Sequence, residues 1–360
     1  MDQVDPVDKL LRRQIKLFEH AHRTPIELKG FGLAMKQEGI DKSKLYCNPD
    51  FLLLPLRECP HLSKLRPEQL SVLTAYYFAR AYSEIATSES VALRYNMEAS
   101  AAVFPLYSDN YMVLFHETAE EFDHIITFRN VCQALLGRGD VIGGDFFPHL
   151  KAVPAMLERY RGKLCANGFG AMYLLMRYIL NLALKQLEGF MTAGLDEKVA
   201  SPLALQIVAG HAEDEARHLT TSLELGLGLF RRATPRSREL ISGAMRITMY
   251  SMIDKRFSGD AAATWNFETG LGVLQRALQH PEFADFPLRA EELRGLWASE
   301  GIAIPASAEF ERSRRWIAGQ LHRLAESMEL ALTPQGEAFE RYLACARGTS
   351  SSSEDTARRA

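Results

Sequence analysis

Two Glu-x-x-His steps, each inside a long stretch of helical periodicity, constrain this chain more than any other feature. They run from Glu121 to His124 and from Glu215 to His218. Residues three positions apart project from one face of a helix, so each step presents a carboxylate and an imidazole side by side. We therefore expect a helical fold in which these two faces point into a common interior.

A further glutamate precedes each step at a similar distance along the chain. These glutamates are Glu89, 32 residues before the first step, and Glu188, 27 residues before the second. Either spacing allows a helix, a loop and an antiparallel return, so each pair can lie level on neighbouring helices. Four carboxylates and two imidazoles directed into one bundle are the ligand set of a carboxylate-bridged di-iron or di-manganese centre. The pattern thus predicts an oxygen-activating metalloenzyme.

The Glu-x-x-His motif alone is weak evidence for a metal site, and the residues around each occurrence decide whether it is a candidate. The step from Glu19 to His22 lies in a short amphipathic stretch, and the step from Glu58 contains Pro60, which a helix interior rejects. The two central steps lie among apolar residues, where four unpaired carboxylates would be very costly to bury. Two Fe(II) ions would neutralise them, although ordinary surface salt bridges are the alternative.

Two positions leave alternatives open. The first glutamate ligand could be Glu84 in place of Glu89, since both lie on plausible inward stripes, but the spacing of Glu89 is better balanced. His211 shares a helical stripe with Glu215 and His218, and is either a simple pairing partner of Glu215 or a third imidazole ligand. Oxygen and imidazole donors suit iron or manganese.

The ligand pattern resembles that of the p-aminobenzoate N-oxygenase-like di-iron proteins. In that family a glutamate, a Glu-x-x-His step and a second glutamate precede a His-x-x-x-Glu-x-x-His segment. The matching residues are Glu89, Glu121, His124, Glu188, His211, Glu215 and His218. The resemblance implies that all seven bind two iron ions, in an all-α, ferritin-like four-helix bundle with additional N- and C-terminal helices. It also implies oxidation of an amine nitrogen, typically of an arylamine, with O2 and an external electron donor.

Composition excludes several other classes of protein. The net charge of −3 gives no sign of binding to nucleic acid or to an anionic membrane. The N-terminus has no apolar signal-like run, and the apolar stretch 169–190 contains charged residues, so we expect a cytoplasmic protein without a membrane span. The scattered cysteines predict reduced thiols; they are Cys47, Cys59, Cys132, Cys165 and Cys345.

The helical periodicity of apolar residues and the positions of helix-ending residues predict one helical domain over residues 1–346, followed by a disordered tail over 347–360. The di-iron bundle core of this domain spans about 66–256, and a C-terminal helical extension spans about 257–346. We expect the extension to cover the bundle or to form an oligomer face, such as that of a homodimer. Residues 25–65 are expected to be irregular, with 52–55 and 59–60 packed on the bundle as a strap. The expected helices span 6–22, 66–101, 108–136, 151–163, 168–193, 202–232, 235–256, 260–278, 286–298, 307–331 and 334–346.

Aromatic and methionine side chains between the ligands suggest an apolar pocket beside the metals, although such residues usually belong to a core. The set comprises Tyr82, Phe115, Phe122, Phe128, Tyr173, Met176 and Phe190. Arg129 could pair with a substrate carboxylate, but a solvated helix-end arginine is the more ordinary interpretation. The ligand set does not separate an N-oxygenase from a di-iron hydroxylase or desaturase acting on carbon, and a non-catalytic ferritin-like bundle is a third possibility.

Overall fold

The computed structural model describes residues 26–49, 64–143, 148–253, 272–288, 292 and 308–330. Several expected features lie outside these residues. They are the helices 6–22 and 334–346, most of 260–278 and 286–298, the tail 347–360, and the steps beginning at Glu19 and Glu58.

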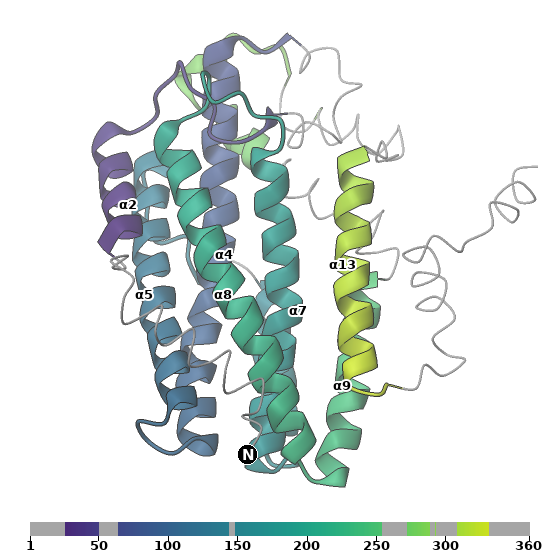
Figure 1. Ribbon diagram of the computed structural model, residues 1–360. Coiled ribbons are helices and arrows are strands. Elements are labelled where there is room, and N and C mark those ends of the chain that lie inside the picture. The colour runs from purple at the N-terminus through teal and green to yellow at the C-terminus, as the bar shows by residue number, and fades with distance from the viewer. Residues whose placement is uncertain are drawn as a thin grey trace, which may run out of the picture.

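Four long helices form the body of the molecule (Figure 1). They are α4 (Pro67–Val103), α5 (Asp109–Leu136), α7 (Ala166–Thr192) and α8 (Pro202–Arg232). Helix α4 packs along α5 and α7 packs along α8, while contacts of α4 with α7 and of α5 with α8 close the bundle. The predicted all-α, ferritin-like four-helix bundle is therefore confirmed.

Local signals in the sequence explain where these helices begin and end. Pro67 and Pro202 occupy first turns, where the missing N–H has no helical partner to lose. The side chains of Ser108 and Ser201 accept hydrogen bonds from backbone N–H groups of α5 and α8. Gly137 ends α5 in the left-handed conformation, with φ 69°. The four bundle helices consequently match their predicted boundaries within about two residues.

The expectation that residues 25–65 are irregular is wrong at the start of this segment, because Ile26–Glu38 forms helix α2. Gly30 and Gly32 lower the helix propensity of this segment by about 1 kcal/mol each, which hides the helix in the sequence. Packing supplies the compensation, since a Cβ at Gly32 would lie 3.0 Å from Thr127 Cγ2 of α5. The glycine therefore allows a close helix–helix approach that propensity alone does not reveal.

The strap predicted at 52–55 and 59–60 lies outside the described residues. Residues 39–48, which follow α2, are irregular as expected. The Leu45 N–H donates to the Val199 carbonyl at 2.8 Å, and the Ser201 N–H donates to the Leu45 carbonyl at 2.7 Å. This isolated bridge ties the segment to the connection between α7 and α8. The segment thereby covers one end of the bundle.

Further helices surround the bundle. The 3-10 turn η3 (Pro148–Lys151) leads into α6 (Ala152–Arg161), and α9 (Pro235–Ile253) and α13 (Ala308–Ser327) pack on α7. Figure 1 places α2 beside α5, and α9 and α13 on the opposite side. Helix α13, in the predicted C-terminal extension, thus lies against the bundle.

Two narrower expectations can also be checked in the described part of the chain. Cys47, Cys132 and Cys165 are free thiols. Across the same residues, no helix combines the length and the apolar character that crossing a membrane requires.

The bundle interior contains two apolar clusters with a polar layer between them. Along α4, Ile85 belongs to one cluster and Tyr95 to the other, with buried Glu89 between them. Along α8, Val208 and Leu225 likewise belong to different clusters. The apolar clusters hold the helices together above and below, and so fix the polar side chains at the middle of the bundle.

Candidate metal centre

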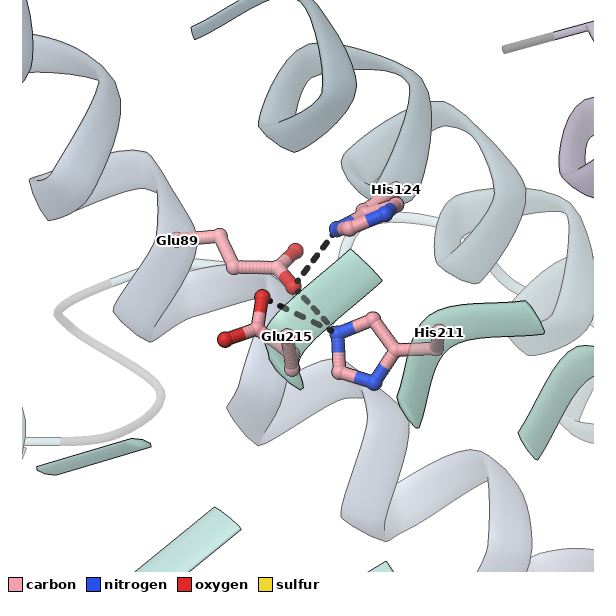
Figure 2. A group of neighbouring side chains, drawn as sticks. All are labelled: Glu89, His124, His211 and Glu215. Atoms are coloured by element: carbon pink, nitrogen blue, oxygen red, sulfur yellow. Dashed lines mark hydrogen bonds and ion pairs between the residues drawn. The ribbon is translucent and has the colours of Figure 1, made fainter. Parts of the chain in front are cut away.

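Glu89, His124, His211 and Glu215 form the first group of metal-type side chains in this polar layer. Each offers one donor atom, and these four atoms lie within 4.8 Å of one another. Figure 2 shows the residues converging from three helices. Glu89 Oε1 lies 3.2 Å from His124 Nδ1 and 2.9 Å from His211 Nε2, while His211 Nε2 lies 3.7 Å from Glu215 Oε1. All four residues are buried.

A second group consists of Glu121, Glu215 and His218, which are also buried. His218 Nδ1 lies 3.0 Å from Glu215 Oε1 and 3.2 Å from Glu121 Oε1. Glu215 belongs to both groups, so its carboxylate lies between two adjacent candidate metal positions. This is the arrangement expected of a dinuclear site with a shared carboxylate.

The carboxylates retain oxygen atoms that fit a cation. Glu89 Oε2, Glu121 Oε2 and Glu188 Oε2 are buried and have no hydrogen-bond partner among the described residues. Buried polar atoms in proteins are nearly always paired, so three such oxygens in one layer call for a ligand. Carboxylate oxygens with imidazole nitrogens match iron or manganese, and the residues therefore fit the two metal ions that the sequence predicts.

Six of the seven predicted ligands lie in the two groups, and Glu188 lies at their edge. Its Oε1 is 2.5 Å from His211 Nδ1 and accepts a hydrogen bond from the Tyr82 hydroxyl at 2.9 Å. The alternative first ligand, Glu84, is in neither group and is only partly buried. The geometry thus favours Glu89 over Glu84, while the role of Glu188 as a ligand stays a prediction.

Two acidic residues that sequence reasoning missed orient the histidines of the two steps. His124 Nε2 lies 3.1 Å from Asp214 Oδ2, and His218 Nε2 lies 2.9 Å from Glu120 Oε2. Arg217 donates to both carboxylates at 2.5 Å. Each pairing leaves Nδ1 of the ring facing the cluster, as outer hydrogen bonds commonly do for metal-binding imidazoles. Because each acidic residue directly precedes a step glutamate, their matching positions were a signal in the sequence.

The carboxylates strongly perturb the first of these histidines. Burial by itself would lower the pKa of His124, but the Glu89 carboxylate and the hydrogen bonds to Asp214 and Glu89 raise it to about 9. Burial would raise the pKa of Asp214, yet its hydrogen bond from His124 and the nearby Arg217 lower it to about 2. Since Asp214 is ionised, the His124 Nε2–H donates to it.

In three other members of the two groups, neighbouring charges again shift the pKa in the direction opposite to the effect of burial. Burial would lower the pKa values of His211 and His218, but Glu188 for the first and Glu215 for the second hold them well above the ordinary value. The pKa of Glu215 is lowered despite its burial, chiefly by His218. Without metal, the site is thus an array of carboxylates that stabilises protonated imidazoles.

A buried arginine completes the polar layer. Arg177 Nη2 donates to Glu121 Oε1 at 2.6 Å, and Nη1 donates to the fully buried Glu117. Asn181 Nδ2 donates to Glu215 Oε2 at 2.5 Å. Sequence reasoning missed these residues as well. The signal was the presence of a charged residue within the most apolar helix, since such a residue is seldom buried without a partner.

A pocket opens against this cluster between α4, α7 and the η3–α6 segment. Glu89, Glu121 and Glu215 contribute to its floor, and Tyr173 and Met176 line its wall as the sequence suggests. Two other aromatic candidates are exposed and do not line it, namely Phe115 and Phe122, and Arg129 is exposed as well. Tyr82 and Phe128 are buried beside the cluster without lining the pocket.

Comparison with known proteins gives one result. The family model described as P-aminobenzoate N-oxygenase AurF matches residues 35–301, which is most of the chain. No curated protein and no solved structure gives a significant match. The chain belongs to the p-aminobenzoate N-oxygenase family, a family of metal-dependent oxygenases whose fold and metal-type residues agree with the bundle and the cluster described above.

Proposed function

We propose that this protein is a di-iron N-oxygenase that uses O2 to oxidise the nitrogen of a small amine, of the arylamine type. Oxidation to the hydroxylamine inserts one oxygen atom into an N–H bond; the second leaves as water with two electrons from an external donor and two protons. Further oxidation would give the nitroso or nitro compound. The residues proposed to hold the irons are Glu89, Glu121, His124, Glu188, His211, Glu215 and His218.

The observation that carries this proposal is the shared carboxylate of Glu215 between two buried groups, together with a third imidazole from His211. Ordinary salt-bridge residues would lie at the surface, whereas these are at most 3% exposed. Family membership favours nitrogen as the atom oxidised, since the ligand set by itself suits oxidation of carbon equally well.

The chain's own side chains would prepare the site for this chemistry. When bound, the two irons would supply the activation of O2, which no amino-acid side chain provides. Asp214 and Glu120 hold the two step histidines with Nδ1 toward the cluster, and Arg217 holds both carboxylates in place. Such outer contacts fix the tautomer and the direction of each ring before a metal arrives.

The pocket would orient the amine and keep water away. In this conformation the pocket has a cavity volume of about 40 Å³, room for a few water molecules. A ring-sized substrate therefore needs η3 and α6, which contribute Leu150 and Val153 to the wall, to move away from α7. Segments that cover active sites commonly move in this way.

The first experiment is metal content per chain, followed by O2 uptake. We expect about two irons per chain after expression in iron-supplemented medium, and uptake of O2 by the chemically reduced protein that depends on an added arylamine. If O2 uptake instead depends on apolar hydrocarbons and not on amines, the N-oxygenase proposal is wrong and the protein is a hydroxylase or desaturase. A well-folded protein that takes up no Fe(II) would refute the metal site altogether.

A matched pair of variants tests the third imidazole. His211→Ala removes a buried ring that touches Glu89 and Glu188, whereas His116→Ala removes an exposed ring from α5. We expect His211→Ala to lose or weaken one iron with the helical content unchanged, and His116→Ala to retain both. Full iron occupancy and unchanged activity in His211→Ala would contradict the seven-ligand assignment.

A further inference from the structure

Arg177 places a buried positive charge beside the proposed iron ligands. It lies on α7, is 4% exposed, and donates from Nη2 to Glu121 Oε1 at 2.6 Å. Burial would lower the pKa of Arg177, but Glu117 foremost, followed by Tyr173 and Glu121, holds it well above its ordinary value. The polar layer that would accept two metal ions therefore already contains one cation.

The charges of the proposed ligands leave no surplus to balance this cation. The four glutamates would neutralise two Fe(II) ions completely, and histidines bind metal as neutral imidazoles. Asp214 and Glu120 lie on the outer side of the histidine rings, where they are partly exposed and both pair with Arg217. Since a buried charge without a partner is costly, the layer needs one further anion next to Arg177.

Glu117 meets this requirement. It is fully buried on α5, one helical turn before Glu121, and accepts a hydrogen bond from Arg177 Nη1. It belongs to neither candidate metal group. Glu121 Oε2 is buried without a hydrogen-bond partner among the described residues, so this oxygen is available to an ion while Oε1 accepts from the arginine. Glu117 thus shares with Glu121 a charge that Glu121 would otherwise balance alone.

We propose that Glu117 is a positioning residue of the metal centre, which balances Arg177 and thereby leaves the charge of Glu121 to the iron ion; this rests on the function proposed above. Without the Glu117 carboxylate, Glu121 would be the one carboxylate hydrogen-bonded to this guanidinium in the described part of the chain. An ion bound by Glu121, Glu215 and His218 would then compete with a buried cation. Residues that hold a ligand from outside commonly change metal affinity by about 10–100-fold.

Anaerobic titration with Fe(II), in competition with a coloured chelator, tests this role without relying on activity. We expect Glu117→Gln to weaken the binding of one Fe(II) by about 10–100-fold. Glu158→Gln is the matched control, because Glu158 pairs with Arg94 and Arg161 at a partly exposed position, and should bind like the unaltered protein. Unchanged affinity in folded Glu117→Gln would overturn the role of Glu117 and leave the di-iron site standing. An unaltered protein that takes up no Fe(II) would refute the proposed function and this inference together.

A double variant separates charge balance from packing. Glu117→Gln combined with Arg177→Gln removes both charges and keeps amide groups that can hydrogen-bond to each other and to Glu121. We expect its Fe(II) affinity to return close to that of the unaltered protein, whereas a persistent loss would overturn the charge balance. If Glu117→Gln alone does not fold, Arg177→Gln decides. Removal of the cation should leave Fe(II) binding at least as tight as in the unaltered protein, and weaker binding would overturn the proposal.

Discussion

The metal-free protein should lose stability as the pH rises above neutrality, and His124 provides the clearest part of this loss. Its pKa is about 9 in the folded protein, because Glu89 and Asp214 favour the imidazolium despite burial, against an ordinary value of 6.5. A group whose pKa is raised by folding stabilises the protein fully below its unfolded pKa, and this stabilisation is lost as the pH rises to the folded value. The affected range is therefore pH 6.5 to 9.

The size of the effect follows from the difference between the two pKa values. A difference of 2.5 pKa units, 9 minus 6.5, corresponds to about 3 kcal/mol of unfolding free energy. Asp214→Asn removes the negative charge opposite Nε2 but keeps a similar shape. In this variant the loss between pH 6.5 and 9 should be smaller by about 1 kcal/mol, because Glu89 continues to favour the imidazolium.

Urea unfolding followed by circular dichroism, with chelator present at pH 6.5, 7.5 and 9, measures both quantities. His211 and His218 add to the loss in the same direction, so comparison of the two proteins isolates the part of the His124 contribution that depends on Asp214. Iron-loaded protein should not show the loss, since metal binding requires neutral imidazoles and becomes stronger as protons leave. Metal-free protein that is as stable at pH 9 as at pH 6.5 would refute the reasoning.

Three further predictions concern packing, capping and metal. Gly226→Ala should destabilise the protein by about 1 kcal/mol or more, since the new Cβ would lie 2.8 Å from Leu175 Cδ2, whereas Gly228→Ala has open space and should stabilise it by up to about 1 kcal/mol. Ser201→Ala should cost about 1 kcal/mol, because it removes the acceptor for the Ala204 N–H at the start of α8. Urea midpoints of the variants test these values. Free Fe(II) at about 1,000 times its dissociation constant should add about 4 kcal/mol to the unfolding free energy.

Local sequence signals mark the boundaries of α4, α5 and α8, because each of these helices begins at a proline or serine with a clear conformational preference. Ser108 and Gly137 bound α5 in this way, and Ser201 begins α8. Helix α2 was not predictable by the same means. Its helical state depends on the fit of Gly32 against Thr127, which is a property of two distant segments and not of one.

The residues of the site likewise fall into those that local sequence spacing predicts and those that only tertiary contacts reveal. The predicted ligands lie at fixed helical spacings, so periodicity indicates which of them share a face, and the structure brings six of the seven into two groups. Partners contributed by another helix have no such spacing. Glu117 and Arg177 are 60 residues apart and meet because α5 and α7 both direct side chains inward. Contacts of this kind require the three-dimensional arrangement of the helices.

The outer carboxylates connect the site to the assembly of the bundle. Asp214, on α8, orients His124 of α5, while Glu120, on α5, orients His218 of α8. Because the pairing is crossed, neither helix can fix its own histidine alone, and both rings are positioned only when α5 and α8 are docked. A metal that binds the oriented rings must then favour the docked state over any separated one, which is the thermodynamic condition for stabilising the whole bundle. The buried charges that weaken the metal-free protein at high pH are thus the same groups through which metal would strengthen it.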